Sequence, residues 1–169
     1  MNTQKELVNI KDIPSLLLNK FQCGKDVIDD YFKHKAIDDD DVTTFGFINN
    51  DRVVALVSLC CTGIMIESGI RIQIIPAVEI KMFAVSEDYQ HKSYPNVDNY
   101  KWSEYCLDKI IAFIYHFTEN YCGASRIVLY SVPEAVNFYI RSGFKEFEKF
   151  MRPSEKRFLE GCIPMYMAL

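Results

Sequence analysis

Apolar residues recur along this 169-residue chain with two spacings, one typical of helices and one typical of strands. The range 100–120 carries apolar side chains three or four positions apart and stops shortly before Gly123, which predicts an amphipathic helix ended by that glycine. The range 26–38 has the same spacing and predicts a second helix. Short runs rich in β-branched and aromatic residues predict strands at 6–10, 43–48, 52–61, 76–85, 126–130, 144–150 and 164–169.

Turn and capping signals predict the remaining elements. Asn49-Asn50-Asp51 separates two strands and indicates a hairpin, and Pro14 opens a short helical turn. A loop is expected around Glu67-Ser-Gly69. The stretch Ser131-Val-Pro-Glu134 has the spacing of a capping box, so it predicts the start of a helix that ends at Gly143.

The predicted order of elements is β-α-α-β-β-β-α-β-α-β-β, which indicates an α/β (α+β) fold. We expect a mixed central sheet of about six to seven strands with about four helices, and parallel pairing in the second half. No linker or repeat divides the chain, so residues 1–169 are expected to form a single domain. Ligands of such sheets bind beyond strand ends, where helix N-termini offer free backbone N–H groups. The polar, glycine-free segment 86–99 lies at such a place.

Charge and cysteine usage narrow the class of protein. The net charge of −4 argues against a general affinity for nucleic acids or acidic membranes. No apolar run reaches the roughly 20 residues that span a bilayer, and the first residues lack a signal-peptide pattern. Six cysteines without Cys-x-x-Cys spacing fit reduced thiols, and no histidine has metal-ligand spacing. We therefore expect a soluble, cytoplasmic protein without a metal.

Three segments together resemble the GNAT family of acyl-CoA N-acyltransferases. Residues 134–144 match the family pattern A-x-x-F-Y-x-x-x-G-F, and residues 79–85 resemble its central strand, which ends in an Ala-Val pair. Residues 21–32 are similar to the opening F-x-C-G-x-x-x-L-D-x-[WY]-[LF] of a subgroup that includes acetyltransferase toxins of toxin–antitoxin pairs. The resemblance covers nearly the whole chain and implies the GNAT fold.

The resemblance implies transfer of an acetyl or other acyl group from acetyl-CoA to a primary amine by direct attack. Tyr139 matches the tyrosine that protonates the coenzyme A thiolate in many members. A tyrosine can do this because a phenol with a pKa near ~10 remains a proton donor at neutral pH. Alternatively, Tyr139 is a core aromatic of a short helix. Glu79 has the spacing to Val85 of the general base in histone-type members. Alternatively, Glu79 pairs with Lys81 or Arg71.

The resemblance also implies the cofactor contacts. Backbone N–H groups of residues 83–85 would hold the pantetheine arm and the thioester oxygen as an oxyanion hole. Residues 90–93 would hold the pyrophosphate. The residues implied to contact acetyl-CoA or coenzyme A are Phe83, Ala84, Val85, Gln90, His91, Lys92, Ser93, Asn137 and Tyr139.

The pyrophosphate segment departs from the family pattern [QR]-x-x-G-x-[GA]. Gln90 fits, but Ser93 and Pro95 stand where the family has glycines that allow close approach of the backbone. Two alternatives follow from this departure. Either the segment still binds pyrophosphate through donors and positive charge on residues 91–93, or the fold has lost cofactor binding.

The sequence thus predicts an acyl-CoA-dependent N-acetyltransferase, a transferase of groups other than aminoacyl groups. The acceptor is an amine of a small molecule, a protein or an aminoacyl-tRNA. Residues 21–32 favour a toxin-type enzyme that acts on aminoacyl-tRNA and has an antitoxin-type partner, whereas the acidic balance counts against tRNA. A non-catalytic binding or regulatory module on a degenerate GNAT fold is a further alternative. A homodimer is left open, and no membrane partner is expected.

Overall fold

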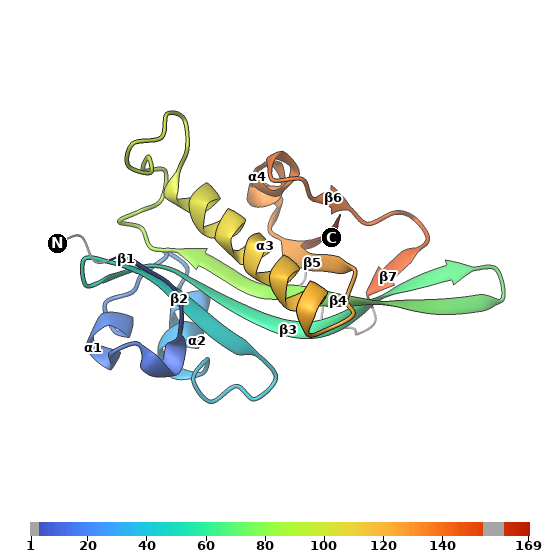
Figure 1. Ribbon diagram of the computed structural model, residues 1–169, viewed down its shortest axis with the longest axis horizontal. Helices are drawn as coiled ribbons and strands as arrows, with labels where there is room; N and C mark the ends of the chain where they lie inside the picture. Colours follow the sequence, from blue (N-terminus) through green and yellow to red (C-terminus); the bar gives the residue numbers. More distant parts are fainter. Residues whose placement is uncertain (1–3, 154–160) are drawn as a thin grey trace. The chain divides into compact units, whose positions relative to one another are not determined.

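A computed structural model describes residues 4–153 and 161–169, and it confirms the predicted α/β class (Figure 1). In these residues eight strands form a mixed sheet in the order β1-β2-β3-β4-β5-β8-β6, and β7 pairs with β3. The elements are β1 (Gln4–Asn9), η1 (Ile10–Asp12), α1 (Ser15–Leu18), α2 (Asp26–His34), β2 (Thr43–Asn49), β3 (Arg52–Ser68), β4 (Arg71–Val85), α3 (Trp102–Asn120), β5 (Arg126–Ser131), η2 (Pro133–Ala135), α4 (Val136–Arg141), β6 (Lys145–Glu146), β7 (Met151–Pro153) and β8 (Ile163–Ala168). The predicted element order is therefore confirmed, with β7 as an additional strand.

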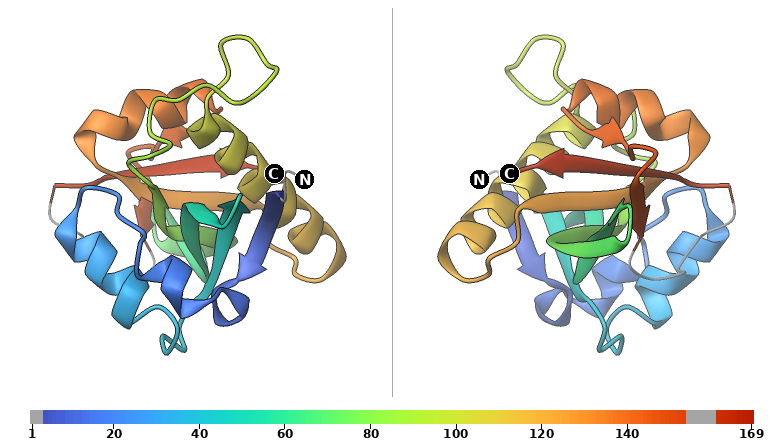
Figure 2. Two further views of the ribbon diagram at one scale, coloured as in Figure 1. Left: turned by 90° about the vertical axis from the view of Figure 1, so that its left-hand side faces the viewer. Right: turned by 90° about the vertical axis from the view of Figure 1, so that its right-hand side faces the viewer.

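The chain forms two compact units, and the first contains residues 1–59 and 82–111. Strands β1, β2 and the first half of β3 pair antiparallel in this unit. Helices α1 and α2 pack on these strands, as the blue and teal segments of Figure 2 show. Their shared core includes the fully buried side chains Ile10, Phe21, Phe32 and Leu56. This burial of large apolar side chains is the main stabilising contribution in the unit.

Residues 21–32, which resemble the opening motif of the toxin subgroup, begin with a turn that packs in this core. The buried rings of Phe21 and Phe32 meet edge to face, with centroids 5.9 Å apart. Gly24 has a φ of +82°, a conformation that favours glycine. The buried carboxylate of Asp29 accepts a hydrogen bond from the Cys23 N–H at 2.8 Å. Burial is the largest cause that raises the pKa of the Cys23 thiol to about 11, and the interaction of the thiol with the Asp29 side chain is the second. The thiol therefore stays protonated at neutral pH.

The second unit contains residues 60–81 and 112–169. Residues 77–80 of β4 pair parallel with residues 126–129 of β5, which confirms the predicted parallel pairing. Strand β8 then pairs antiparallel with both β5 and β6. The core of this unit includes Ile64, Ala77, Val128 and Met151. Parallel pairing with buried apolar residues fits the continuous apolar run of β5.

Strands β3 and β4 are longer than predicted. They extend to Ser68 and start at Arg71, so the expected loop around Glu67-Ser-Gly69 is reduced to a tight hairpin tip (Figure 1). Pro76 lies inside β4, one residue before the stretch that pairs with β5, where its missing N–H breaks no bond of that pairing. The strand predicted at 144–150 is instead the two-residue β6 followed by the separate β7.

The predicted capping box is wrong. Ser131 is the last residue of β5, and its hydroxyl donates to the carbonyl of Val132 at 2.9 Å. A 3-10 turn then precedes α4, and neither of these helices has a side-chain cap at its start. Helix α3 ends at Asn120, as predicted for the range 100–120, and Gly123 follows it in the connection to β5. None of the described helices is long and apolar enough to cross a membrane. The six cysteines are free thiols, of which Cys23 and Cys106 are buried.

Candidate active site

The C-terminal end of β4 presents part of its backbone away from β3. The N–H of Ser86 donates to the carbonyl of Val54 in β3 at 2.8 Å. Backbone groups alternate in direction along a strand, so Ala84 also points toward β3, whereas the N–H groups of Phe83 and Val85 point toward the opposite edge. Of the three predicted backbone donors, two therefore face away from β3.

Gln90 connects the segment after β4 to two other parts of the first unit. Its side-chain amide nitrogen donates to the carbonyls of Val85 and Cys23, each at 2.9 Å. The Gln90 N–H also bonds to the carbonyl of Ser86 at 3.0 Å. The side chain thus links the end of β4 to the turn at Cys23, and both of its amide hydrogens are engaged.

The residues after Ser93 form a hairpin that returns to the same point. The N–H of Tyr94 donates to the carbonyl of Tyr100 at 2.7 Å, and the N–H of Trp102 donates to the carbonyl of Lys92 at 3.1 Å. These bonds make an antiparallel bridge between Ser93 and Lys101. In Figure 1 the hairpin is the loop that projects beyond the first residues of α3. The insertion therefore places residues 90–93 directly beside the first residue of α3.

Two backbone donors remain available in this segment. The N–H groups of His91 and Ser93 have no hydrogen-bond partner within residues 4–153 and 161–169. His91 has a φ of +61°, and both residues are exposed. The Lys92 N–H between them donates to the carbonyl of Tyr89 at 3.3 Å, so the two free donors are not successive. Free N–H groups beside a helix N-terminus can bind an anion, and the exposed Lys92 side chain adds positive charge. The carboxylate of Glu104 is used to cap α3, since it accepts the Lys101 N–H at 2.8 Å.

Glu79 is a buried carboxylate in the middle of β4. Only 8% of the residue is exposed, and the Cys60 thiol donates to its Oε2 over 3.8 Å. It lies opposite Val128 in the parallel pairing with β5. Arg71 lies eight positions earlier on the same strand, about 27 Å away at ~3.4 Å per residue, so it is not the partner of Glu79. A carboxylate buried on a strand in this way can act as a proton acceptor for a nearby amine.

Tyr139 lies on α4 among aromatic rings. Its ring meets those of Phe138 and Phe144 edge to face, with centroids 5.1 and 5.7 Å away. Burial raises the pKa of Tyr139 to about 12, and its hydroxyl has no hydrogen-bond partner in the described part of the chain. The neutral phenol is thus strongly favoured and holds a proton that it can donate. Asn137 lies two residues earlier on α4 and is exposed.

The sequence did not single out the aromatic residues around the hairpin. Trp102 falls within the range 100–120 predicted as an amphipathic helix, and Tyr94 falls within the glycine-free segment 86–99. The rings of Tyr94 and Trp102 are in contact, with centroids 4.8 Å apart. The signal that could have revealed the hairpin is the pair Asn96 and Asn99, which both adopt a positive φ that asparagine tolerates.

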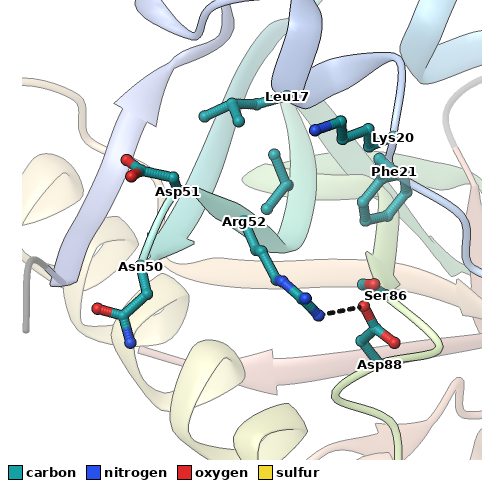
Figure 3. A pocket seen from close by; sticks show the side chains of 9 residues that line it. Leu17, Lys20, Phe21, Asn50, Asp51, Arg52, Ser86 and Asp88 are labelled. Carbon is teal, nitrogen blue, oxygen red and sulfur yellow. Dashed lines mark hydrogen bonds and ion pairs between the residues drawn. The ribbon is translucent and has the colours of Figure 1, made fainter.

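A polar cavity of about 320 Å³ lies beside the start of this segment (Figure 3). Arg52 and Asp88 form an ion pair of 3.0 Å at its rim, and both side chains are largely exposed. Lys20 and Asp51 add one further charge of each sign to the lining. The charges balance, so the cavity has no preference for an anion. The described residues contain no cluster of His, Cys, Asp or Glu that could bind a metal.

No protein-family model matches the chain, and no curated protein is similar to it in sequence. Solved structures, however, match it over 99% of its length. A bacterial toxin has 17% identity and a TM-score of 0.72, with 89% of that chain covered. The AtaTR complex bound with acetyl-CoA has 14% identity, a TM-score of 0.71 and 93% coverage. AtaT complexed with acetyl-methionyl-tRNAfMet has 13% identity, a TM-score of 0.71 and 95% coverage. These likenesses, together with the mixed sheet and the four helices, show that the chain has the GNAT fold.

Proposed function

We propose that this protein is an acyl-CoA-dependent N-acetyltransferase. The observation that carries the proposal is the hairpin after Ser93, which leaves two free N–H groups beside the first turn of α3 despite the missing glycines. An anionic group such as a pyrophosphate fits donors of this kind. Solved structures of the same fold include toxins bound to acetyl-CoA.

The acyl donor would be held at two places in the first unit. The N–H groups of His91 and Ser93, with the charge of Lys92, bind the pyrophosphate. The N–H groups of Phe83 and Val85 bind the pantetheine arm and the thioester oxygen, because they point away from β3. The Gln90 side chain is already bonded to two carbonyls, so we assign it the role of holding this segment.

The reaction is an attack of a neutral amine on the thioester carbonyl carbon. A C–N bond forms, the C–S bond breaks, and the amine loses one proton while the thiolate gains one. Tyr139 supplies the proton to the thiolate, since its raised pKa keeps the phenol protonated over the working pH range. Glu79 is the acceptor of the amine proton. The products are an N-acetyl amide and the free thiol of coenzyme A.

An aminoacyl-tRNA is the second candidate for the acceptor, next to an amine of a small molecule or protein. It is favoured by the likeness to AtaT complexed with acetyl-methionyl-tRNAfMet. An α-amino group has a pKa of about 7.7–8.0, so much of it is neutral at physiological pH, whereas a lysine-type amine with a pKa near ~10.4 needs a base. A partner of the antitoxin kind accompanies this candidate, as in the AtaT toxin bound to the C-terminus of AtaR.

Acetyl transfer from radiolabelled acetyl-CoA tests the proposal and separates the acceptors. The purified chain is incubated with aminoacylated tRNA, the same tRNA without amino acid, or free lysine and polyamines. Label on the aminoacylated tRNA alone would identify the α-amine, and Glu79→Gln would then slow the reaction less than with a lysine-type acceptor. Binding of acetyl-CoA without transfer to any of these amines or to protein would favour the non-catalytic binding module instead. No binding at all would refute the proposed function.

A further inference from the structure

Three aromatic rings hold the base of the hairpin. Trp102 is 5% exposed and meets Tyr94 edge to face, with ring centroids 4.8 Å apart. Tyr94 stacks on Tyr105 with centroids 4.1 Å apart and ring planes only 15° apart. Trp102 and Tyr105 also meet edge to face at 5.9 Å. We call Tyr94, Trp102 and Tyr105 the aromatic clamp.

Strand β1 fastens the aromatic clamp from the other side. The side-chain amide of Gln4 donates to the hydroxyl of Tyr105 at 2.7 Å and to that of Tyr94 at 3.3 Å. The Tyr105 hydroxyl donates in turn to the carboxylate of Glu6. Lys109 forms an ion pair with Glu6 at 3.1 Å and lies 5.4 Å from the centre of the Tyr105 ring. The clamp therefore joins three elements of the first unit, namely β1, the hairpin and α3.

The clamp also brackets the segment 90–93. The residue before it, Tyr89, packs on Trp102 with ring centroids 5.2 Å apart, and the residue after it, Tyr94, packs on the same ring. Trp102 is bonded to the segment itself through its N–H and the carbonyl of Lys92. Both ends of the segment are thus fixed to one buried side chain.

We infer that the aromatic clamp positions the backbone donors of His91 and Ser93 for the pyrophosphate of an acyl-CoA, in place of the glycines that this segment lacks. The inference rests on the proposed function. A loop of non-glycine residues has few conformations that leave its N–H groups pointing outward, and His91 must hold a positive φ to do so. Fixing both ends on Trp102 restricts the segment to that conformation. The free energy of binding is then not spent on ordering the loop.

Tyr94→Ala tests this inference, with Val97→Ala as the matched control. Val97 is 47% exposed at the tip of the same hairpin, outside the clamp. Calorimetry measures the Kd of acetyl-CoA and of acetyl-pantetheine, which lacks the pyrophosphate and the nucleotide. We expect Tyr94→Ala to raise the Kd of acetyl-CoA about tenfold and to leave that of acetyl-pantetheine unchanged, since the ring contacts of Tyr94 with Tyr100, Trp102 and Tyr105 are lost. Val97→Ala should change neither.

The fluorescence of Trp102 gives a second measurement, because it is the one tryptophan of the chain. Its emission should respond to acetyl-CoA but not to acetyl-pantetheine, and should shift to the red in Tyr94→Ala. Gln4→Leu removes the hydrogen bonds to the hydroxyls of Tyr94 and Tyr105 but no core side chain, and it should weaken binding of acetyl-CoA and not that of acetyl-pantetheine. Equal weakening of both donors, or of neither, would overturn the inference. If the wild-type chain binds acetyl-CoA no more tightly than acetyl-pantetheine, the proposed pyrophosphate site fails as well.

Discussion

Replacing Gln90 with leucine separates a supporting role of this side chain from direct cofactor binding. The side-chain amide donates to the carbonyls of Val85 and Cys23, and leucine can replace neither bond. Both acceptors lie in buried residues of the first unit, so they lose their partner in a partly dry environment.

The expected cost follows from these two bonds. A typical hydrogen bond contributes about 0.5–1.5 kcal/mol, so the pair contributes about 1–3 kcal/mol to the free energy of unfolding. A chain of this length loses roughly 2–4 °C in Tm for each kcal/mol. The variant should therefore unfold about 4–8 °C below the wild type when the loss is ~2 kcal/mol.

Urea denaturation of the ligand-free protein measures this loss, and Gln73→Leu is the control. Gln73 is an exposed glutamine of β4, so its replacement should change stability by less than ~0.5 kcal/mol. An unchanged urea midpoint in Gln90→Leu, combined with a large loss of acetyl-CoA affinity, would refute the supporting role. It would show instead that Gln90 contacts the cofactor directly.

Four further experiments test other parts of the molecule. Tyr139→Phe should lower the transfer rate by about 10²–10⁴-fold while the Kd of acetyl-CoA stays the same, and equal loss of both would make Tyr139 structural. Burial raises the pKa of Tyr139 to about 12, so the phenol stays protonated above its ordinary pKa near ~10. The transfer rate of the wild type should therefore not fall between pH 9 and 10. The stability that the neutral phenol contributes should be lost only as the pH rises through 10 toward 12. Asp29→Ala should destabilise the protein by about 1–3 kcal/mol in thermal unfolding, because the Cys23 N–H loses its buried acceptor, whereas Asp29→Asn keeps an acceptor oxygen and should cost less. Iodoacetamide should alkylate the exposed Cys61 well before Cys23, whose thiol pKa is raised to about 11, and mass spectrometry of timed samples shows the order.

The order of elements could be predicted because apolar spacing is a local property of the chain. The apolar residues of the long helix α3 have one helical spacing throughout, and those of the buried strand β5 form one continuous run. Both elements were therefore predicted within a few residues. The capping box at Ser131 was wrong because the same residue also ends β5, and its hydroxyl bonds to the neighbouring carbonyl instead. A local motif does not reveal which of two adjacent elements uses a side chain.

The family-like residues of the site could be named from the sequence, but their surroundings could not. The sequence alone indicates a degenerate pyrophosphate loop for the glycine-free segment 86–99, because the residues that hold this segment in place are distant in sequence. Gln4 is 101 positions from its partner Tyr105, and Gln90 is 67 positions from Cys23. Contacts over such separations depend on the tertiary fold, and a single sequence gives no direct sign of them.

Titration of the full chain with acetyl-CoA tests the central claim most directly. We predict saturable binding in calorimetry, and a rise in the unfolding midpoint that corresponds to about 2.7 kcal/mol when acetyl-CoA is present at 100 times its Kd. Removing the pyrophosphate and nucleotide, as in acetyl-pantetheine, should abolish most of this stabilisation. An absence of heat and of any shift in the unfolding midpoint at millimolar acetyl-CoA would contradict the claim that residues 90–93 form a working pyrophosphate site.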